Sequence, residues 1–545
     1  MAAVCFNTSM IGYLEIISDP AYAGSIVAMT YPQIGNYGVV KNDLQSDGLT
    51  VAGLVVRDIC DTPSNYRSET SLPAFLAEQG VVAITDVDTR ALSTEIREQG
   101  AMRAVISTTE SDPAALLAKL QAQSPEDAKG LVKRVSTEAR YHYFLDKEYA
   151  EWLSPIAEPT ARLAVYDCGV PRNTLRNLVR VGCSVTIVPF TTSAADVLET
   201  KPNGVLFSSG PGEAQELVAT IEAARGLMGK VPVLGIGLGL AVMAIAAGGK
   251  VEPLKAGHHG ANYPVKDLVS GKVLITTQNH GAALAFDSLG PLVPELSQGV
   301  SAHPASRDLR FWISQGVAPV VQNAQFGRIR LTQVNLNDGS VEGLEFLDIP
   351  AFAVQYNPQI PPGPIALPGR KAVLPAALAA SPLSAFVRLM EGRADYLYSL
   401  DEAAPKAVAA AATEGEKGAA KTDTPVDDEA VSEAAVEVAA LAEAEDAVAV
   451  EVEVEVEVEV AAEGEAPAAP EVAAPEVAAT EVAATEVAAT DPDATADFAP
   501  ADLGTLFDPD APDGTPADEP EPNTPAAPGS ATPDAAPTES EADHA

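Results

Sequence analysis

The stretch VPVLGIGLGLAVMAIAAGG, residues 231–249, decides the fold because it joins a strand, a glycine turn and an apolar helix. The apolar residues of 231–236 predict a buried strand, and those of 240–245 predict a helix. Many α/β enzymes carry a nucleophile on such a turn, at the carboxyl end of a parallel sheet. The turn here reads Gly237-Leu238-Gly239 and holds no Ser, Cys or Thr. The stretch therefore predicts an enzyme-like elbow without a nucleophile.

The segments around this stretch predict two domains. From RLAVYDCGV onward, strands and helices alternate over residues 162–398, which predicts a doubly wound α/β sheet. Residues 1–125 mix short β-like runs with turns and one helix, so they predict a β-rich N-terminal domain. Residues 126–161 are polar and are interpreted as a linker.

Residues 399–545 differ in composition from the rest of the chain. Ala, Glu, Pro, Thr and Asp dominate there, and EVEVEVEVEV at 451–460 has a strand period but would stack carboxylates on one face. Residues 401–545 hold 38 acidic and three basic side chains. Few aromatic residues and high charge predict a disordered acidic tail, whose partner stays unknown.

Composition also excludes several classes of function. The net charge is −42, of which the first 400 residues carry only −7, and no basic cluster suggests a nucleic-acid partner. The four cysteines form no CxxC pair and have no histidine at zinc-ligand spacing, so no metal site is expected. The N-terminus resembles no signal peptide, and no long uncharged apolar run predicts a membrane span. We expect a soluble, cytoplasmic protein.

Two glycine turns follow predicted strands, SSGPGE at 208–213 and GIGLG at 235–239. Close backbone approach in tight βα turns explains both. A dinucleotide fingerprint would need Gly or Ala where Leu240 stands, so a nicotinamide or flavin cofactor is rejected.

Longer motifs carry a resemblance to a known family. FNTSMIGYLEIISDPAYAGSIVAMTYPQIGNYGV and the segments after it resemble the N-terminal domain of the carbamoyl-phosphate synthase small subunit. GVLFSSGPGE, GHHGANYPVKDL, TTQNHG, VNLNDGSVEGL and FAVQYNPQ resemble the class I glutamine amidotransferase domain of that subunit. The resemblance runs from about residue 4 to 395 and keeps the order of the motifs.

The resemblance implies a Cys-His-Glu triad that hydrolyses glutamine and passes ammonia to a large subunit. That large subunit combines ammonia with bicarbonate and two ATP, so ATP would bind there and this chain is expected to hold no cofactor. The three triad positions are Gly237, Asn357 and Gln359 in this chain. Neither a glycine nor an amide can replace a thiol and its base. No catalytic residue of the triad is intact.

The glutamine-binding positions that the resemblance implies are partly kept. Those where the backbone matters are retained: Gly210, Gly212, Leu238, Asn279 and Gly281. Three side chains are altered, Ala21 for Ser, Ala241 for Gln and Ala282 for Phe. Each lost polar partner costs roughly 1–3 kcal/mol, so binding is expected to fail together with catalysis.

A relocated nucleophile is the alternative to a dead site. Cys168 ends the first strand of the second domain, but a buried packing role is the simpler interpretation. Ser208 and Ser209 are expected to shape the first glycine turn, and His280 belongs to the family scaffold. His258 and His259 are expected to contact neighbours rather than bind metal.

Two further departures from the family concern chain length. The family usually has 25–30 more residues before FNTSMIGY, so the first strands look trimmed. Residues 287–330 are largely an insertion, which is expected to pack and to cover the inherited pocket.

Three functions remain open at this point. The first is a glutaminase-inactive structural or regulatory partner of a synthase large subunit, in carbamoyl phosphate formation for arginine and pyrimidines. The second is an active glutamine-hydrolysing small subunit. The third is a paralogue recruited to an unrelated scaffold role.

Overall fold

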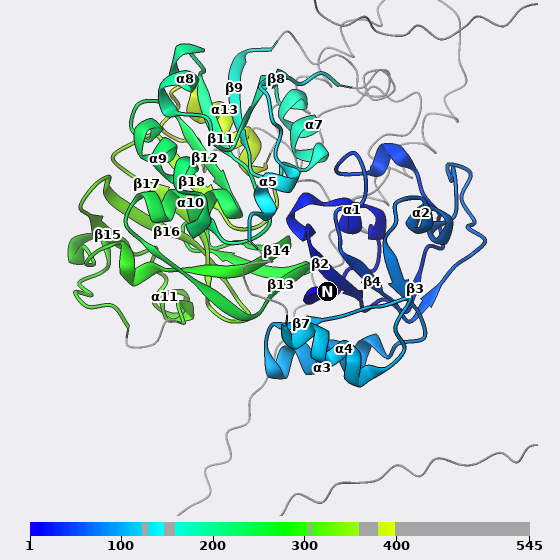
Figure 1. Cartoon of the computed structure of the whole chain (residues 1–545). Helices are drawn as coiled ribbons and strands as arrows, with labels where there is room; N and C mark the ends of the chain where they lie inside the picture. The colour runs from blue at the N-terminus through cyan, green and yellow to red at the C-terminus, as the bar shows by residue number, and fades with distance from the viewer. Residues whose placement is uncertain (123–128, 146–158, 305–307, 359–379, 398–545) are drawn as a thin grey trace, which may run out of the picture. The chain divides into compact units, whose positions relative to one another are not determined.

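The computed structural model describes residues 1–122, 129–145, 159–304, 308–358 and 380–397 (Figure 1). The predicted tail, 399–545, and Gln359 lie outside these residues. No helix in the described ranges is long and apolar enough to span a membrane.

The N-terminal region is built on a five-stranded sheet of order β6-β4-β2-β1-β7. Neighbouring strands are parallel except for β1 and β7, which are antiparallel. Its strands are β1 (Ala2–Asn7), β2 (Ser25–Met29), β4 (Gly53–Val55), β6 (Val82–Ile84) and β7 (Met102–Ala104), and β3 (Gln33–Ile34) pairs with β5 (Asp58–Ile59) separately. Its helices are α1 (Tyr13–Ser18), α2 (Leu72–Glu78), α3 (Thr89–Gln99) and α4 (Pro113–Ala122).

The second region is an eleven-stranded sheet whose centre is parallel, in the order β18-β12-β11-β9-β10. These strands are β9 (Ala161–Asp167), β10 (Cys183–Pro189), β11 (Gly204–Phe207), β12 (Val233–Ile236) and β18 (Ala351–Val354). Beyond β18 the sheet continues with antiparallel strands: β17 (Val341–Phe346), β16 (Gly327–Asn335), β13 (Lys250–Asp267) and β14 (Val273–Ala285), with β15 (Val320–Asn323) beside β16.

Alternation along the central strands explains why helices cover both faces. On β9, Ala164 and Tyr166 pack into one core with α9 (Val218–Leu227) and α10 (Leu238–Ala246). Leu163 and Val165 point into a second core with α7 (Arg172–Arg180) and α13 (Pro382–Met390). Successive strand residues face opposite sides, so this arrangement confirms the expected doubly wound α/β fold. A short α8 (Ala194–Glu199) follows β10.

The predicted linker, 126–161, also contains ordered elements. Helix α5 (Leu131–Val135) begins after Gly130, and β8 (Tyr141–His142) pairs antiparallel with β10. Part of this segment therefore extends the edge of the large sheet.

Hydrogen bonds join the N-terminal region to the second region. Thr8 Oγ1 donates to Asn262 Oδ1 at 3.0 Å, and Ala101 N donates to Lys255 O at 2.7 Å. The guanidinium of Arg172, at the start of α7, pairs with Asp47 at 2.6 Å. The N-terminal residues are therefore placed to line a cleft with the ends of strands from the large sheet.

Candidate functional site

The elbow after β12 keeps an unusual backbone conformation at Gly237. Its φ is 55° and its ψ is −110°, a region that residues with a side chain rarely occupy. Gly237 N donates to Val354 O on β18 at 2.9 Å, and α10 starts at the next residue. A Cβ built on Gly237 would lie 3.4 Å from its nearest neighbour, Ser209 Cβ. The elbow thus has room for a side chain, although its backbone conformation disfavours one.

The first glycine turn, after β11, is fixed by close packing. Ser208 Oγ accepts from Cys168 N at 3.0 Å and donates to Ser209 O at 2.8 Å, as expected for a residue that shapes the turn. A Cβ on Gly210 would lie 1.9 Å from Cys168 O, so only glycine fits there. Gly212 has φ +78° and serves the turn through its backbone conformation.

Asn357, at the expected position of the base, lies near the elbow. Its backbone N donates to Thr277 O on β14 at 2.9 Å, which ties the end of β18 to β14. Gln355, two residues earlier, has its carbonyl oxygen 3.6 Å from the position of a Cβ at Gly237. Two of the three predicted triad positions, Gly237 and Asn357, therefore follow the ends of the neighbouring strands β12 and β18. The third, Gln359, lies outside the described residues.

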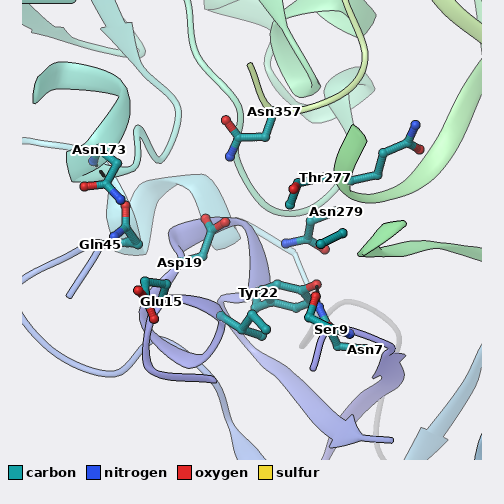
Figure 2. Close-up of a pocket in the computed structure, with 13 residues that line it drawn as sticks. Asn7, Ser9, Glu15, Asp19, Tyr22, Gln45, Asn173, Thr277, Asn279 and Asn357 are labelled. Atoms are coloured by element: carbon teal, nitrogen blue, oxygen red, sulfur yellow. Dashed lines mark hydrogen bonds between the residues drawn. The ribbon is translucent and has the colours of Figure 1, made fainter. Parts of the chain in front are cut away.

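A cleft lined mainly by residues with polar side chains lies beside Asn357 (Figure 2). Asn279 and Thr277 line it from β14, while Glu15 and Asp19 line it from the N-terminal region. In Figure 2 the amide groups of Asn357 and Asn279 and the carboxylate of Asp19 converge on the same space. The remaining lining residues are Asn7, Ser9, Ile16, Tyr22, Gln45, Asn173, Ala261 and Gln278.

The cleft carries two carboxyl groups with raised pKa values. Burial raises the pKa of Glu15 to about 7 and that of Asp19 to about 6. Asp19 also accepts a hydrogen bond from Ala21 N at 2.9 Å, which partly offsets the effect of burial. Neither carboxyl was identified from the sequence. The sequence Asp19-Pro20 is typical of the start of a helical turn, and Asp19 does cap the turn Pro20–Tyr22. This pattern could have indicated a structural role for Asp19.

The amide of Asn279 is oriented by a buried imidazole. His259 Nδ1 lies 2.7 Å from Asn279 Oδ1, and burial lowers the pKa of His259 to about 4, so that the neutral ring donates. Asn279 Nδ2 has no hydrogen-bond partner in the described part of the chain. This amide therefore offers a free donor at the cleft.

The other predicted glutamine-binding positions spread over three elements. Leu238 and Ala241 are buried in α10, and Ala21 lies in the turn Pro20–Tyr22 of the N-terminal region. Gly281 and Ala282 lie on β14, where a Cβ on Gly281 would meet nothing within 4 Å. Their role in binding glutamine stays a prediction.

Cys168 is unsuited to act as a relocated nucleophile. Its side chain is fully buried, and burial with the nearby Asp167 raises its pKa well above the ordinary value. A thiol attacks as its thiolate, so this shift keeps the group inert at neutral pH. The packing interpretation of Cys168 agrees with this environment.

The insertion, 287–330, packs against the large sheet as expected. Trp312, on α11 (Arg310–Gln315), is fully buried and shares a core with Leu289 and Phe326. Asn323 Nδ2 donates to Ala247 O at 2.8 Å, which ties the insertion to the end of α10. None of its described residues lines the cleft at Asn357, so the expectation that it covers this space is wrong there. It instead borders a second cleft, through Asp287, His303, Pro304, Asp308 and Leu309.

Comparisons with known proteins agree with this architecture. Residues 1–106 match the family model of the carbamoyl-phosphate synthase small chain, CPSase domain, and residues 164–292 match that of glutamine amidotransferase class-I. A carbamoyl phosphate synthase small chain of Syntrophotalea carbinolica is 40% identical over 66% of this chain and 87% of its own length. The chain belongs to the carbamoyl phosphate synthase small chain family.

Other relatives of the family support the same assignment. The small chain of Thermotoga maritima is 41% identical over 66% of this chain and 88% of its own length. The small chain of Bacillus caldolyticus is 39% identical over 66% of this chain and 85% of its own length. The resemblance to the small-subunit family is thus confirmed, while the predicted domain boundaries remain a prediction.

Proposed function

We propose that this small chain is a glutaminase-inactive structural or regulatory partner of a carbamoyl phosphate synthase large subunit. The observation that carries the proposal is Gly237. This residue occupies the nucleophile elbow with φ +55°, and it has no side chain that could attack an amide.

The residues around the elbow offer no substitute for the triad. Asn357 has an amide where the family has a base, and an amide does not accept a proton from a thiol at neutral pH. Gln359 stands where the family has an orienting Glu. Cys168 is buried with a raised pKa, which argues against a displaced thiol.

The partner follows from the family. The relatives are named small chains, and a small chain implies a large one that carries the ATP-dependent chemistry. In this proposal the chain itself needs no cofactor, and the large subunit uses free ammonia. A large subunit that still requires a small one for stability or regulation would explain why the scaffold persists.

The test uses the full chain, alone and mixed with a large chain, and measures ammonia release from glutamine. The Thermotoga maritima small chain serves as the positive control. We expect release at background, with co-elution of the two chains and unimpaired carbamoyl phosphate synthesis from ammonia. Glutamine-dependent release above background would overturn the inactive assignment, and its loss in Cys168→Ala would locate a displaced thiol. Failure of the chains to co-elute would overturn the partner assignment.

A further inference from the structure

Two histidines on neighbouring strands face each other beyond the cleft. His258 on β13 and His280 on β14 are direct cross-strand partners, and their ring centroids lie 4.8 Å apart. Glu342 on β17 reaches the same place and is fully buried. One ligand atom from each of these three residues lies within 4.8 Å of the other two. Because the three residues come from three strands, no sequence spacing revealed the cluster.

Each histidine already has an acceptor on its outer ring nitrogen. His258 Nε2 lies 2.9 Å from Asp338 Oδ2, and His280 Nδ1 lies 2.9 Å from Ala282 O. A carboxylate and a carbonyl can only accept, so both outer nitrogens carry the proton. In a neutral ring the inner nitrogens, His258 Nδ1 and His280 Nε2, then present lone pairs. Histidines that bind metals are held in this same way by their outer nitrogen.

Both inner nitrogens meet a further acceptor. Gln278 Oε1 lies 2.9 Å from each of them. The orientation of that amide is set from behind, because Gln278 Nε2 donates to Thr276 Oγ1 at 3.1 Å and Thr276 Oγ1 donates to Tyr263 O at 2.9 Å. Reversing the amide would place two oxygens against each other at Thr276. Three acceptor atoms therefore converge. Asn335 Nδ2 lies 3.4 Å from His258 Nδ1, but this donor is directed at Glu342 Oε1 at 2.7 Å.

The buried carboxylate adds negative charge at the same point. Glu342 Oε1 accepts from Asn335 Nδ2 at 2.7 Å and lies 3.7 Å from His258 Nδ1, while Glu342 Oε2 has no partner in the described residues. A buried, unpartnered carboxylate oxygen is costly. Protonation of His258 alone would give Gln278 Oε1 a donor but would leave His280 Nε2 facing the same oxygen without a proton. Protonation of both rings would place two neighbouring cations 4.8 Å apart. A single dication satisfies every one of these atoms.

We propose that His258, His280, Glu342 and Gln278 form a binding site for a divalent transition-metal ion of the zinc type. Two imidazoles, a carboxylate and an amide oxygen are a suitable ligand set for such an ion. The ligand separations of 2.9 Å and 3.7 Å bracket the roughly 3.3 Å edge of a tetrahedron with zinc bonds of about 2.0 Å. The metal would fasten β13 and β14 to β17. The site does not depend on whether the chain hydrolyses glutamine.

The test uses the full chain, purified without a histidine tag and freed of metal by chelator. Zn²⁺ titration followed by metal analysis is expected to give one bound equivalent and a higher thermal midpoint, and Co²⁺ is expected to give the visible spectrum of a four-coordinate site. Glu342→Gln, which keeps the side-chain shape, is expected to weaken Zn²⁺ binding at least about 10-fold. His303→Ala is the matched control, because His303 lies on the insertion and contacts Gly290 O. That variant is expected to bind as the parent does.

Two results would overturn the proposal. One is a chain that takes up less than a tenth of an equivalent, and the other is binding that is unchanged in His258→Ala. Because a core variant can fail to fold, a second measurement uses the parent chain alone. Selective ¹⁵N labelling of histidine should show the inner nitrogens of His258 and His280 unprotonated and shifted by Zn²⁺. Two doubly protonated rings that ignore Zn²⁺ would instead identify a proton-only network.

Discussion

The glycine turns at the centre of the sheet and the glycine on β14 are retained for different physical reasons. A Cβ on Gly239 would lie 2.0 Å from Phe207 O, and one on Gly210 would lie 1.9 Å from Cys168 O. At Gly281 a Cβ would meet nothing within 4 Å, and the φ of this residue is not positive. The fold itself demands glycine at the first two positions but not at Gly281. A retained glycine in the turns is therefore no sign of retained glutamine binding.

The same contrast holds between backbone and side chains at the elbow. Gly237 has φ +55° although no side chain stands on the elbow. Packing of β12 and α10 preserves the path of the chain, whereas chemistry depends on side chains that packing does not require. Loss of function at such a site can leave the fold untouched.

The largest effect is expected from restoring the triad. Gly237→Cys, Asn357→His and Gln359→Glu together should leave glutamine turnover at least about 100-fold below that of the Thermotoga maritima small chain. We predict that the alanines at 21, 241 and 282 hold glutamine poorly, and a correct pose is worth several kcal/mol. Ammonia release under saturating glutamine measures the difference.

The control for that experiment adds Ala21→Ser, Ala241→Gln and Ala282→Phe. The variant with all six substitutions should turn over glutamine faster than the triple variant if the pocket keeps its old shape. Turnover of the triple variant equal to that of the relative would show that the pocket was never remodelled, and it would weaken the case for a non-catalytic role.

A large loss of stability is expected from Gly239→Ala. The added methyl group meets the backbone of β11 at Phe207, which cannot move aside, so the free energy of unfolding should fall by about 3 kcal/mol or more. Gly237→Ala is the matched control, because its nearest neighbour lies at 3.4 Å and its cost comes from the left-handed φ alone, about 1–2 kcal/mol. Urea unfolding compares the two, and equal losses would contradict the packing argument.

A smaller effect is expected from the carboxyl groups of the cleft. The pKa of Glu15 is raised from its ordinary value to about 7, so the folded state binds the proton more tightly than the unfolded one. Stability from this group is then full below about pH 4.5 and declines as the pH rises to about 7. Glu15→Gln should reduce the loss of stability between pH 5 and pH 8 by about 1 kcal/mol, a value lowered for the solvent access of a half-buried side chain.

Urea unfolding at the two pH values tests this, with Glu95→Gln on the exposed side of α3 as control. Other titrating groups contribute equally to parent and variant, so they cancel in the comparison. An unchanged pH dependence in Glu15→Gln would show that the cleft solvates this carboxyl fully.

Local signals allowed the central sheet to be predicted, while long-range contacts escaped prediction. The strand and helix expected within 231–249 are β12 and α10, because hydrophobic period and glycine punctuation act within a few residues. The long hairpin of β13 and β14 was not predicted, since its register depends on partners distant in sequence. For the same reason nothing local indicated that Glu15 and Asp19 would face Asn357, or that His258 would meet His280 and Glu342.

The smallest effect is expected at Gly281. Alanine there finds open space and an ordinary backbone conformation, so Gly281→Ala should change the free energy of unfolding by less than about 1 kcal/mol and should stabilise the chain, because alanine loses less conformational entropy on folding. Gly210→Ala, measured alongside, should be severely destabilising because Cys168 O stands 1.9 Å from the new methyl group. Urea unfolding of both variants separates a glycine that the fold needs from one that it does not. If Gly281→Ala cost as much as Gly210→Ala, a close contact of β14 would be required there, and the distinction between the turns and β14 would collapse. A neutral or stabilising result would show that the fold does not require glycine at this position of β14.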